Sequence, residues 1–229
     1  MGLNTTVGIA ASGLKITQAA TAQVSANIAG ASVDGYTAKS VSTQALYATT
    51  GLVGFKTTVT RAFDQEVFGQ LATSTATSSY LDAKNTYLQQ IESLLGSTEN
   101  GAALPTALST FSTDLQTLAA QPDSTSAQIQ VVNSATVVAQ TLNSLSSSVS
   151  DVASAVSTSI SETVDDVNTL TSQIADLNAR IVSLQAQGGD VTGLQDARDK
   201  AVLQLSNDVD VEVKPQTNGS IRVSTGGGL

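Results

Sequence analysis

The chain of 229 residues contains no cysteine, no histidine and no tryptophan, and aromatic residues make up only 3% of it. These absences exclude disulfides, thiolate nucleophiles, zinc fingers and acid–base sites built on histidine. The scarcity of aromatic residues also argues against a thick core. The abundant Ser, Thr and Ala residues instead favour long, slender helices that meet through small side chains.

Basic residues are also scarce, because ten Lys and Arg stand against nineteen Asp and Glu, for a net charge of −9. Nucleic acids and anionic membranes both require a positive protein surface, so we expect neither as a partner. No apolar run is long enough for a membrane span or for the core of a secretory signal peptide. Residues 85–179 contain no Lys or Arg but nine carboxylates. This segment either presents an acidic surface that neighbours meet through polar and small apolar contacts, or reflects a drift in composition without consequence.

Three groups of carboxylates are the candidates for chemistry: Asp165 with Asp166, Asp196 with Asp199, and Asp208 with Asp210 and Glu212. The first two groups fall on predicted exposed helix positions, where they would not face each other across a cleft as glycosidase carboxylates do. The third group lacks the glycine and the closing glutamate of a calcium loop, and the glycine run 226–228 lacks the Lys-Ser/Thr of a phosphate loop. We therefore expect no catalytic residue, no cofactor and no metal, in a protein that is not an enzyme.

Residues 3–31 predict an amphipathic helix with one narrow stripe. Apolar or small residues recur every seven positions in two rows: Val7, Leu14, Thr21 and Ile28, with Ala10, Thr17, Val24 and Ala31. This pattern is typical of a coiled-coil seam rather than of a helix face buried in a globular core. The stripe buries little surface by itself, so we expect partner helices to cover it. A left-handed Gly30 is expected to end the helix, and Asp34-Gly35 then predicts a turn.

The remaining pattern predicts a mainly α fold, an elongated helical bundle or coiled coil with small β-hairpin elements near 37–61 and 209–224. The first hairpin is expected to turn at 51–54, and Asp64 could cap the helix that follows. Four helices are expected over 65–96, 104–120, 126–187 and 192–207, separated by a loop at 96–101 and by turns. From Val149 to Leu184, apolar residues recur every 3.5 residues on average, the period of a left-handed coiled coil. The weakest helical stretches are 73–79 and 146–148, where a bend or an interruption is expected.

This pattern divides the chain into four segments. Residues 1–35 form an N-terminal coiled-coil core helix, and residues 36–64 form an extended β-hairpin linker. Residues 65–207 form an elongated helical bundle domain, and residues 208–229 begin a β-rich domain. We expect that last domain to be truncated, because the chain stops inside it.

Short motifs at both ends of the chain carry a resemblance. Ala11-Ser12-Gly13-Leu14, Asn27-Ile28-Ala29 and Gly35-Tyr36-Thr37 together resemble the N-terminal signature of the bacterial flagellar axial proteins, which include rod, hook and hook–filament junction proteins. Val33-x-Gly35-Tyr36-Thr37, Arg61-x-Phe63-Asp64 and Leu194-x-Asp196-x-Arg198-Asp199 are most similar to the hook-associated protein 1 family within that group. The sequence departs from the family pattern at Gly30, where the family has Asn, and at Lys39, where the basic residue is displaced.

The resemblance implies a structural subunit of the bacterial flagellum that forms the hook–filament junction by packing its terminal helices with neighbouring axial subunits. We predict an assembly interface of seven residues: Val7, Leu14, Val24, Asn27, Ile28, Gly35 and Tyr36. The implied partners are further copies in a ring or tube, the hook protein, a second junction protein and the flagellar export apparatus. The implied location is extracellular, on the flagellum, reached through type III export without a cleaved signal peptide.

Two alternatives stay open at this point. One is a flagellar hook or rod protein, and the other, of a different class, is a coiled-coil surface or sensor domain. In either flagellar case the uncovered stripe leaves the first helix marginal by itself. We therefore predict that residues 1–35 are disordered in the isolated monomer and helical in the assembled state.

Overall fold

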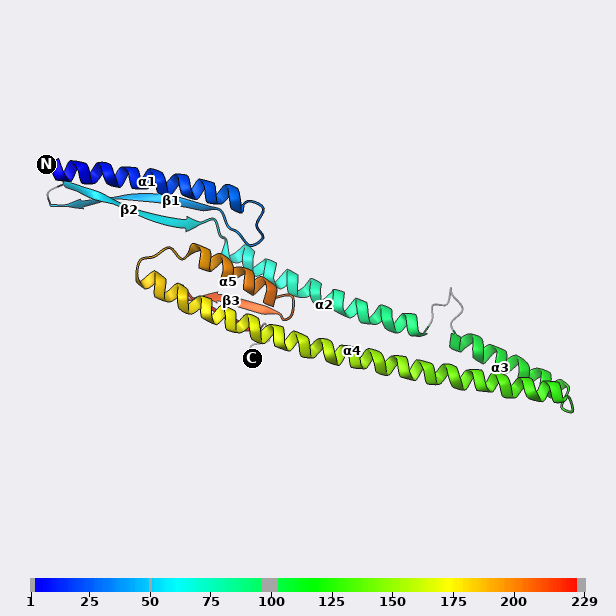
Figure 1. Ribbon diagram of the computed structural model, residues 1–229. Coiled ribbons are helices and arrows are strands. Elements are labelled where there is room, and N and C mark those ends of the chain that lie inside the picture. The colour runs from blue at the N-terminus through cyan, green and yellow to red at the C-terminus, as the bar shows by residue number, and fades with distance from the viewer. Residues whose placement is uncertain (1–2, 50, 96–102, 226–229) are drawn as a thin grey trace. The chain divides into compact units, whose positions relative to one another are not determined.

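The computed structural model describes residues 3–49, 51–95 and 103–225 and contains five helices and two hairpins in that part of the chain (Figure 1). The elements in order are α1 Leu3–Gly30, β1 Lys39–Ala48, β2 Gly51–Arg61, α2 Gln65–Leu95, α3 Ala103–Ala120, α4 Thr125–Ala186, α5 Thr192–Leu205, β3 Val211–Pro215 and β4 Ile221–Thr225. The predicted fold class, mainly α with small β-hairpins, is confirmed. The expected loop at 96–101 lies outside the described residues.

The chain divides into two compact units. Unit 1 comprises residues 1–78 and 166–229, and unit 2 comprises residues 79–165. The predicted segments 1–35, 36–64 and 208–229 all fall in unit 1, and the predicted segment 65–207 is shared between the units. The first boundary lies at the end of the Thr- and Ser-rich run of α2, where helix propensity is weakest.

The core of unit 1 forms where α2, α4 and α5 meet the β3–β4 hairpin. Its buried apolar side chains are Phe68, Ala72, Ile174, Ala201, Val202, Leu205, Val211 and Ile221. Phe63 packs at the edge of this core, and the centroid of its ring lies 5.3 Å from the centroid of the Phe68 ring. Ala201, Val202 and Leu205 of α5 thus pack in one core with Ile174 of α4.

Asn178 attaches the β3–β4 hairpin to α4 through the backbone of β4. Its Nδ2 donates to the carbonyl oxygen of Ile221 at 2.9 Å, and its Oδ1 accepts from the Ile221 N–H at 3.0 Å. The amide thus pairs with one residue of an edge strand in the way that a neighbouring strand would. Gly219 forms the turn of this hairpin with a φ of +85°, which favours glycine.

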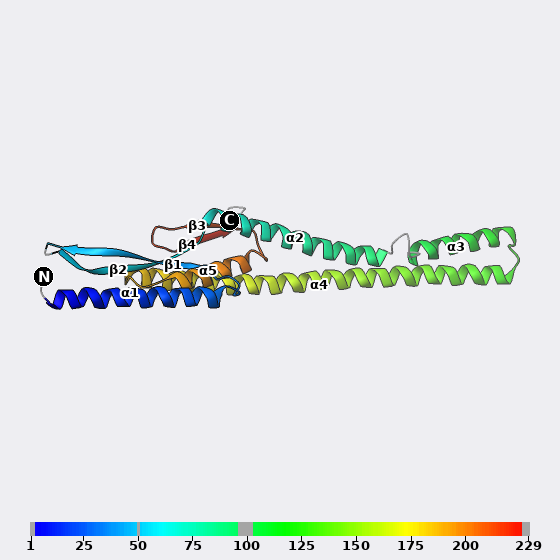
Figure 2. The same cartoon turned by 90° about the horizontal axis from the view of Figure 1, so that it is seen from above.

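The α1 helix lies along the β1–β2 hairpin, and both views show the helix and the hairpin side by side (Figure 2). The two strands pair antiparallel from Lys39↔Arg61 to Ala48↔Gly51, with a register shift at Leu46/Tyr47. The predicted hairpin is confirmed, but its expected turn at 51–54 is wrong. Residues 51–54 form the start of β2 instead. Gly51 already pairs with Ala48 of β1, and its φ is +112°.

Unit 2 consists of the second half of α2, α3 and the first part of α4. In the α2 part of this unit, Leu81, Leu88 and Ile91 all remain exposed. The stretches 73–79 and 146–148 are both continuous helix, so the interruption expected at 146–148 is absent from α4 as described. The bend expected at 73–79 stays a prediction. The hydroxyl groups of Ser and Thr in and beside these stretches form hydrogen bonds within the helix. They donate to the carbonyl oxygen four residues earlier, as Thr77 and Ser150 do.

The Asn178 bridge yields a prediction for the local stability of β4. Asn178→Ala leaves the N–H and the carbonyl of Ile221 without a partner, which costs about 1–3 kcal/mol. We expect the free energy of opening of the β4 amides, measured by native-state hydrogen exchange, to fall by this amount. Asn168→Ala, at an exposed position of the same helix, is the matched control and should leave them unchanged. Equal protection in both variants would contradict the structural role of the bridge.

Candidate functional site

The α1 helix has two different faces. One face packs on the β1–β2 hairpin and carries the partly or fully covered residues Ile9, Ser12, Ile16, Ala20, Gln23, Asn27 and Gly30. The steps of three and four residues keep this set on one side of the helix. The heptad stripe predicted from the sequence lies on a different side, so the hairpin does not cover it.

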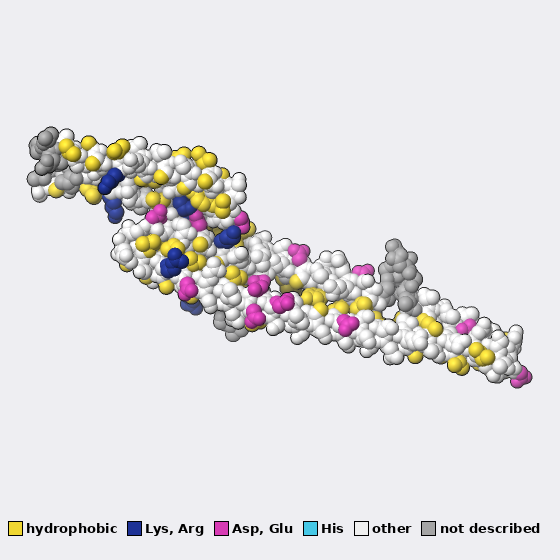
Figure 3. All heavy atoms as spheres, viewed as in Figure 1, with side chains coloured by type: hydrophobic (Ala, Val, Ile, Leu, Met, Phe, Trp, Pro, Cys, Tyr) yellow, Lys and Arg dark blue, Asp and Glu magenta, His cyan; other side chains and the backbone are white. Residues whose placement is uncertain are grey.

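The stripe is solvent-exposed in the structure. Val7, Leu14, Val24 and Ile28 have relative exposures of 60%, 61%, 57% and 73%. Figure 3 shows hydrophobic side chains gathered on the outward surface of α1. A row of half-exposed aliphatic side chains at coiled-coil spacing is an unusual feature for a helix without a partner, and it indicates a contact surface.

The end of α1 is fixed by Tyr36, whose ring lies directly over Gly30. A β-carbon added to Gly30 would come within 2.7 Å of the ring carbons, so no larger residue fits there without a shift. The expectation that Gly30 is left-handed is wrong, because the positive φ of this region belongs to Gly35, at +81°. Gly30 is required for close packing, and Gly35 for the turn.

Asn27 joins the end of α1 to the start of β1. Its Nδ2 donates to the carbonyl oxygen of Lys39 at 2.8 Å, and its Oδ1 accepts from the Lys39 N–H at 3.0 Å. The same Oδ1 accepts from the hydroxyl of Tyr36 at 2.8 Å. Asn27 therefore holds the backbone of β1 and the side chain of Tyr36 together.

The seven residues of the predicted interface thus occupy two kinds of place. Val7, Leu14, Val24 and Ile28 are exposed and can meet another chain. Asn27, Gly35 and Tyr36 contact residues of their own chain, with Gly35 packed against the side chain of Lys200 on α5. Their part in an interface between subunits stays a prediction.

A cluster of five buried charges lies where the hairpin meets α5. It contains three cations and two carboxylates: Lys39, Arg61, Arg198, Asp196 and Asp199. Their side chains are between 5% and 11% exposed. The net charge of the cluster is therefore +1, held almost entirely away from water.

Arg61 connects the two carboxylates. Its Nη1 lies 3.0 Å from Asp196 Oδ1, and its Nη2 lies 2.6 Å from Asp199 Oδ2. Asp196 also accepts from the Lys39 ammonium, and at 2.6 Å from the Thr37 hydroxyl. A planar guanidinium suits such a two-point contact, which a lysine ammonium cannot make.

Arg198 extends the cluster to the second hairpin. Its Nε and Nη2 donate to Asp199 Oδ1 at 3.1 and 3.0 Å, and its Nη1 donates to the carbonyl oxygen of Gly219 at 3.0 Å. Among the described residues, no buried side-chain nitrogen or oxygen lacks a hydrogen-bond partner. Complete pairing is the condition under which buried charges are tolerated.

The environment of the cluster shifts two pKa values. Burial alone raises the pKa of Asp196, but hydrogen bonds from Lys39, Thr37 and Arg61 more than offset it, and the net shift is downward. Burial lowers the pKa of Arg198, and Asp199 opposes that change. The arginine stays charged because its ordinary pKa is so high.

The expectation that Asp196 and Asp199 are solvent-exposed is wrong. Both are buried, because the hairpin brings Lys39 and Arg61 onto the face of α5 that carries them. The two motifs that resembled the hook-associated family, Arg61-x-Phe63-Asp64 and Leu194-x-Asp196-x-Arg198-Asp199, meet here. The opposite charges of Arg61 in the first motif and of Asp196 and Asp199 in the second were the signal in the sequence that could have predicted this contact. In the first motif Asp64 also caps α2, since its Oδ1 accepts from the N–H groups of Glu66 and Val67.

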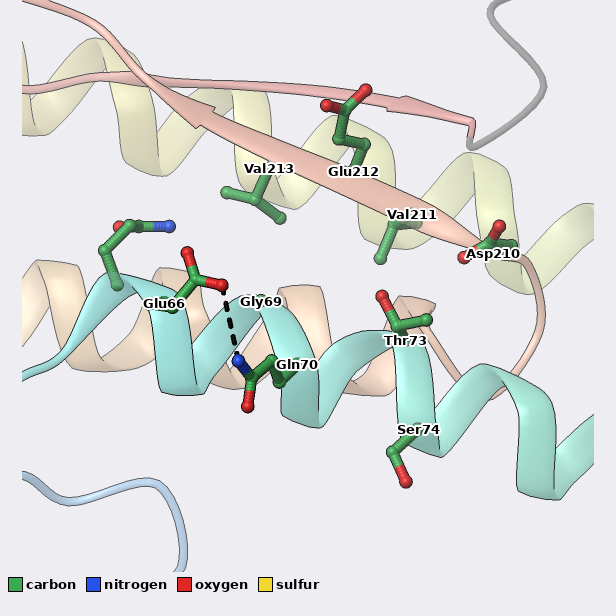
Figure 4. A pocket seen from close by; sticks show the side chains of 10 residues that line it. Glu66, Gly69, Gln70, Thr73, Ser74, Asp210, Val211, Glu212 and Val213 are labelled. Atoms are coloured by element: carbon green, nitrogen blue, oxygen red, sulfur yellow. Dashed lines mark hydrogen bonds between the residues drawn. The ribbon is translucent and has the colours of Figure 1, made fainter.

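A hollow of about 770 Å³ opens between α2 and β3 (Figure 4). Val211 and Val213 point from the strand towards α2, and Glu212 points to the opposite side. The carboxylate of Glu66 on the helix wall accepts from Gln70 Nε2 at 3.3 Å. Three carboxylates line the hollow, Glu66, Asp210 and Glu212, but they do not form a group that could hold a metal ion, so we assign the hollow no chemistry.

Two absences concern the described ranges alone. Within residues 3–49, 51–95 and 103–225, His, Cys, Asp and Glu nowhere gather in threes at a spacing that could hold a metal ion. In the same ranges no helix combines the length and apolarity that a membrane crossing requires.

The buried cluster predicts a defined pH dependence. Because folding lowers the pKa of Asp196, its contribution is complete above the ordinary value of 3.8 and is lost as the pH falls through the lower folded value. The charged groups that contact it are Lys39 and Arg61, both from the hairpin. Asp196→Asn should lower the free energy of unfolding by about 3 kcal/mol at pH 7.

The difference between wild type and this variant should shrink as the pH falls below 3.8, measured by urea denaturation at several pH values. Asp176→Asn, which changes an exposed carboxylate of α4, should change little at any pH. A constant difference for Asp196→Asn down to the acid range would contradict the assigned role of its charge.

Comparison with known proteins places these features in a family. A family model described as "Flagellar hook-associated protein FlgK helical domain" matches residues 88–229. The chain is 31% identical over 232 residues to flagellar hook-associated protein 1 of Bacillus subtilis (strain 168), covering 96% of this chain and 45% of the relative. It is 27% identical over 234 residues to flagellar hook-associated protein 1 of Escherichia coli (strain K12), covering 99% of this chain and 42% of the relative.

A solved structure gives the same result for the fold. The flagellar hook junction protein FlgK from Burkholderia pseudomallei is similar with a TM-score of 0.63 and 32% identity, over 70% of this chain and 28% of that chain. The chain therefore spans less than half the length of the relatives that it matches. The resemblance read from the sequence is confirmed, and the chain belongs to the flagellar hook-associated protein FlgK family, whose helical domain it carries over residues 88–229.

Proposed function

We propose that this chain is part of a structural, non-catalytic subunit that forms the hook–filament junction of the bacterial flagellum. The exposed stripe of α1 carries the proposal, since Val7, Leu14, Val24 and Ile28 present coiled-coil spacing to solvent. Family membership supports the same reading, because the relatives are named hook-associated and hook junction proteins. Those names favour a junction protein over the hook or rod alternative.

The stripe would act by packing against helices of neighbouring subunits. Each of its aliphatic side chains is more than half exposed, and covering one would stabilise the assembly by about 1 kcal/mol. One such contact is weak, but a ring or tube repeats it in every subunit. The stripe is also narrow and rich in Thr and Ala, so a contact between two monomers buries little apolar surface. This weak contact keeps subunits from associating before assembly.

The proposed partners are further copies of the subunit, the hook protein, a second junction protein and the flagellar export apparatus. The proposed location is the extracellular flagellum, reached without a cleaved signal peptide. Neither nucleic acid nor a membrane is a proposed partner, since the chain carries a net charge of −9.

A first prediction concerns the order of α1 before assembly. We expect residues 1–35 to be disordered in dilute monomer and helical in the assembled state, because a marginal helix needs its stripe covered. Hydrogen exchange followed by mass spectrometry would show unprotected amides in this segment of the monomer. Slow exchange throughout residues 1–35 at low protein concentration would contradict the prediction.

A second prediction tests the stripe in cells. In a strain whose own gene is replaced, Leu14→Asp or Val24→Asp in the full-length protein should reduce the number of filaments at least tenfold, because each places a charge inside the proposed contact. Ala22→Asp, at an exposed position of α1 outside the stripe, is the matched control and should support normal filaments. Electron microscopy counts the filaments, and immunoblotting of secreted protein separates failed export from failed assembly. Normal filament numbers in both stripe variants would refute the proposed function.

A further inference from the structure

The helix and hairpin of residues 3–61, here called the helix–hairpin part, do not share the apolar core of unit 1. The buried cluster of the described residues is built from α2, α4, α5, β3 and β4, and its partly buried neighbours begin at Phe63. Residues 3–61 therefore need another means of attachment to the rest of unit 1, here called the body.

Charged and polar contacts provide that attachment. Lys39, Arg61 and Thr37 reach Asp196 and Asp199 on α5. On the surface nearby, Lys200 Nζ lies 3.8 Å from Asp34 Oδ2, and the side chains of Lys200 and Asp34 are 44% and 94% exposed. The buried contacts are the strong ones, because water screens the exposed pair.

These contacts form a continuous path across unit 1. Asn27 of α1 holds the backbone of Lys39 through two hydrogen bonds. The Lys39 ammonium binds Asp196, and Arg61 joins Asp196 to Asp199. Asp199 binds Arg198, which donates to the carbonyl of Gly219 in the β3–β4 turn. Each link is a hydrogen bond or an ion pair, and Arg61 and Arg198 make theirs through the fixed fork of a guanidinium.

We propose that Lys39, Arg61, Asp196 and Asp199 act as a charge clamp that sets the direction of the helix–hairpin part on the body and couples the order of α1 to the β3–β4 turn. Arg61 is the central positioning residue, since among the residues that the structure describes it alone forms ion pairs with both carboxylates. An apolar contact would allow the hairpin to slide, whereas the two-point fork of a guanidinium fits one register. The link to assembly rests on the proposed function, in which neighbouring subunits order α1, but the clamp itself does not.

Arg61→Lys is the test variant, because it keeps the charge and removes the fork. Arg222→Lys makes the same substitution at an exposed position of β4 and is the matched control. Both are made in the full-length protein as the monomer, and hydrogen exchange followed by mass spectrometry is read in three regions. These are the hairpin at 39–61, the β3–β4 turn at 216–220 and the core helices at 170–181 and 201–205.

With Arg61→Lys we expect exchange at least tenfold faster in the hairpin, about threefold faster at the turn and unchanged in the core helices. The control should match wild type everywhere. Three results would overturn the clamp: no difference between the two variants, no protection of the hairpin in wild type, or equal acceleration in all regions. The last would mean that the cluster is only one part of a cooperative core.

The transmission from α1 is tested by Asn27→Ala in hook–filament preparations, where α1 is expected to be ordered. Faster exchange at 216–220 supports coupling from α1, and unchanged exchange there refutes it. Failure of the proposed function gives a different pattern, in which the stripe variants build normal filaments while Arg61→Lys still loosens the hairpin. The two conclusions can therefore fail independently.

Discussion

The contact of Arg61 with both Asp196 and Asp199 is the interaction on which the arrangement of unit 1 depends. Burying five charges is costly, and it succeeds here because no buried side-chain nitrogen or oxygen of the described residues lacks a hydrogen-bond partner and because the carboxylates are shared between cations. The benefit is geometric rather than energetic. Replacing such a network by apolar side chains can be neutral for stability, but it would remove the single direction that a forked contact imposes.

This arrangement allows α1 to serve two purposes at once. One face of the helix packs on the hairpin through aliphatic, small and polar residues, ending at Asn27 and Gly30. Another face carries the exposed stripe of Val7, Leu14, Val24 and Ile28. The contact within the chain fixes where the stripe points, and it leaves the stripe itself available to other subunits.

The periodic parts of this fold could be read from the sequence, and the parts that depend on distant contacts could not. Spacing alone predicts the helices and both hairpins, since amphipathic patterns are local. It places Asp196 and Asp199 in water, because nothing in a helical pattern shows that Lys39 and Arg61, more than a hundred residues away, will cover them. It also misassigns Gly30, since a close approach by the Tyr36 ring and a left-handed turn both select glycine. The turn of the first hairpin fails for the same reason, because Gly51 and Gly54 lie within a strand and not in the turn.

The packing of Tyr36 on Gly30 limits how parts of this family can be exchanged. The family pattern carries an asparagine at the position of Gly30, and any β-carbon there would overlap the ring of Tyr36. A chimera that joins the first helix of such a relative to the hairpin of this chain would therefore have a steric conflict at its joint, although each piece is compatible with its own background.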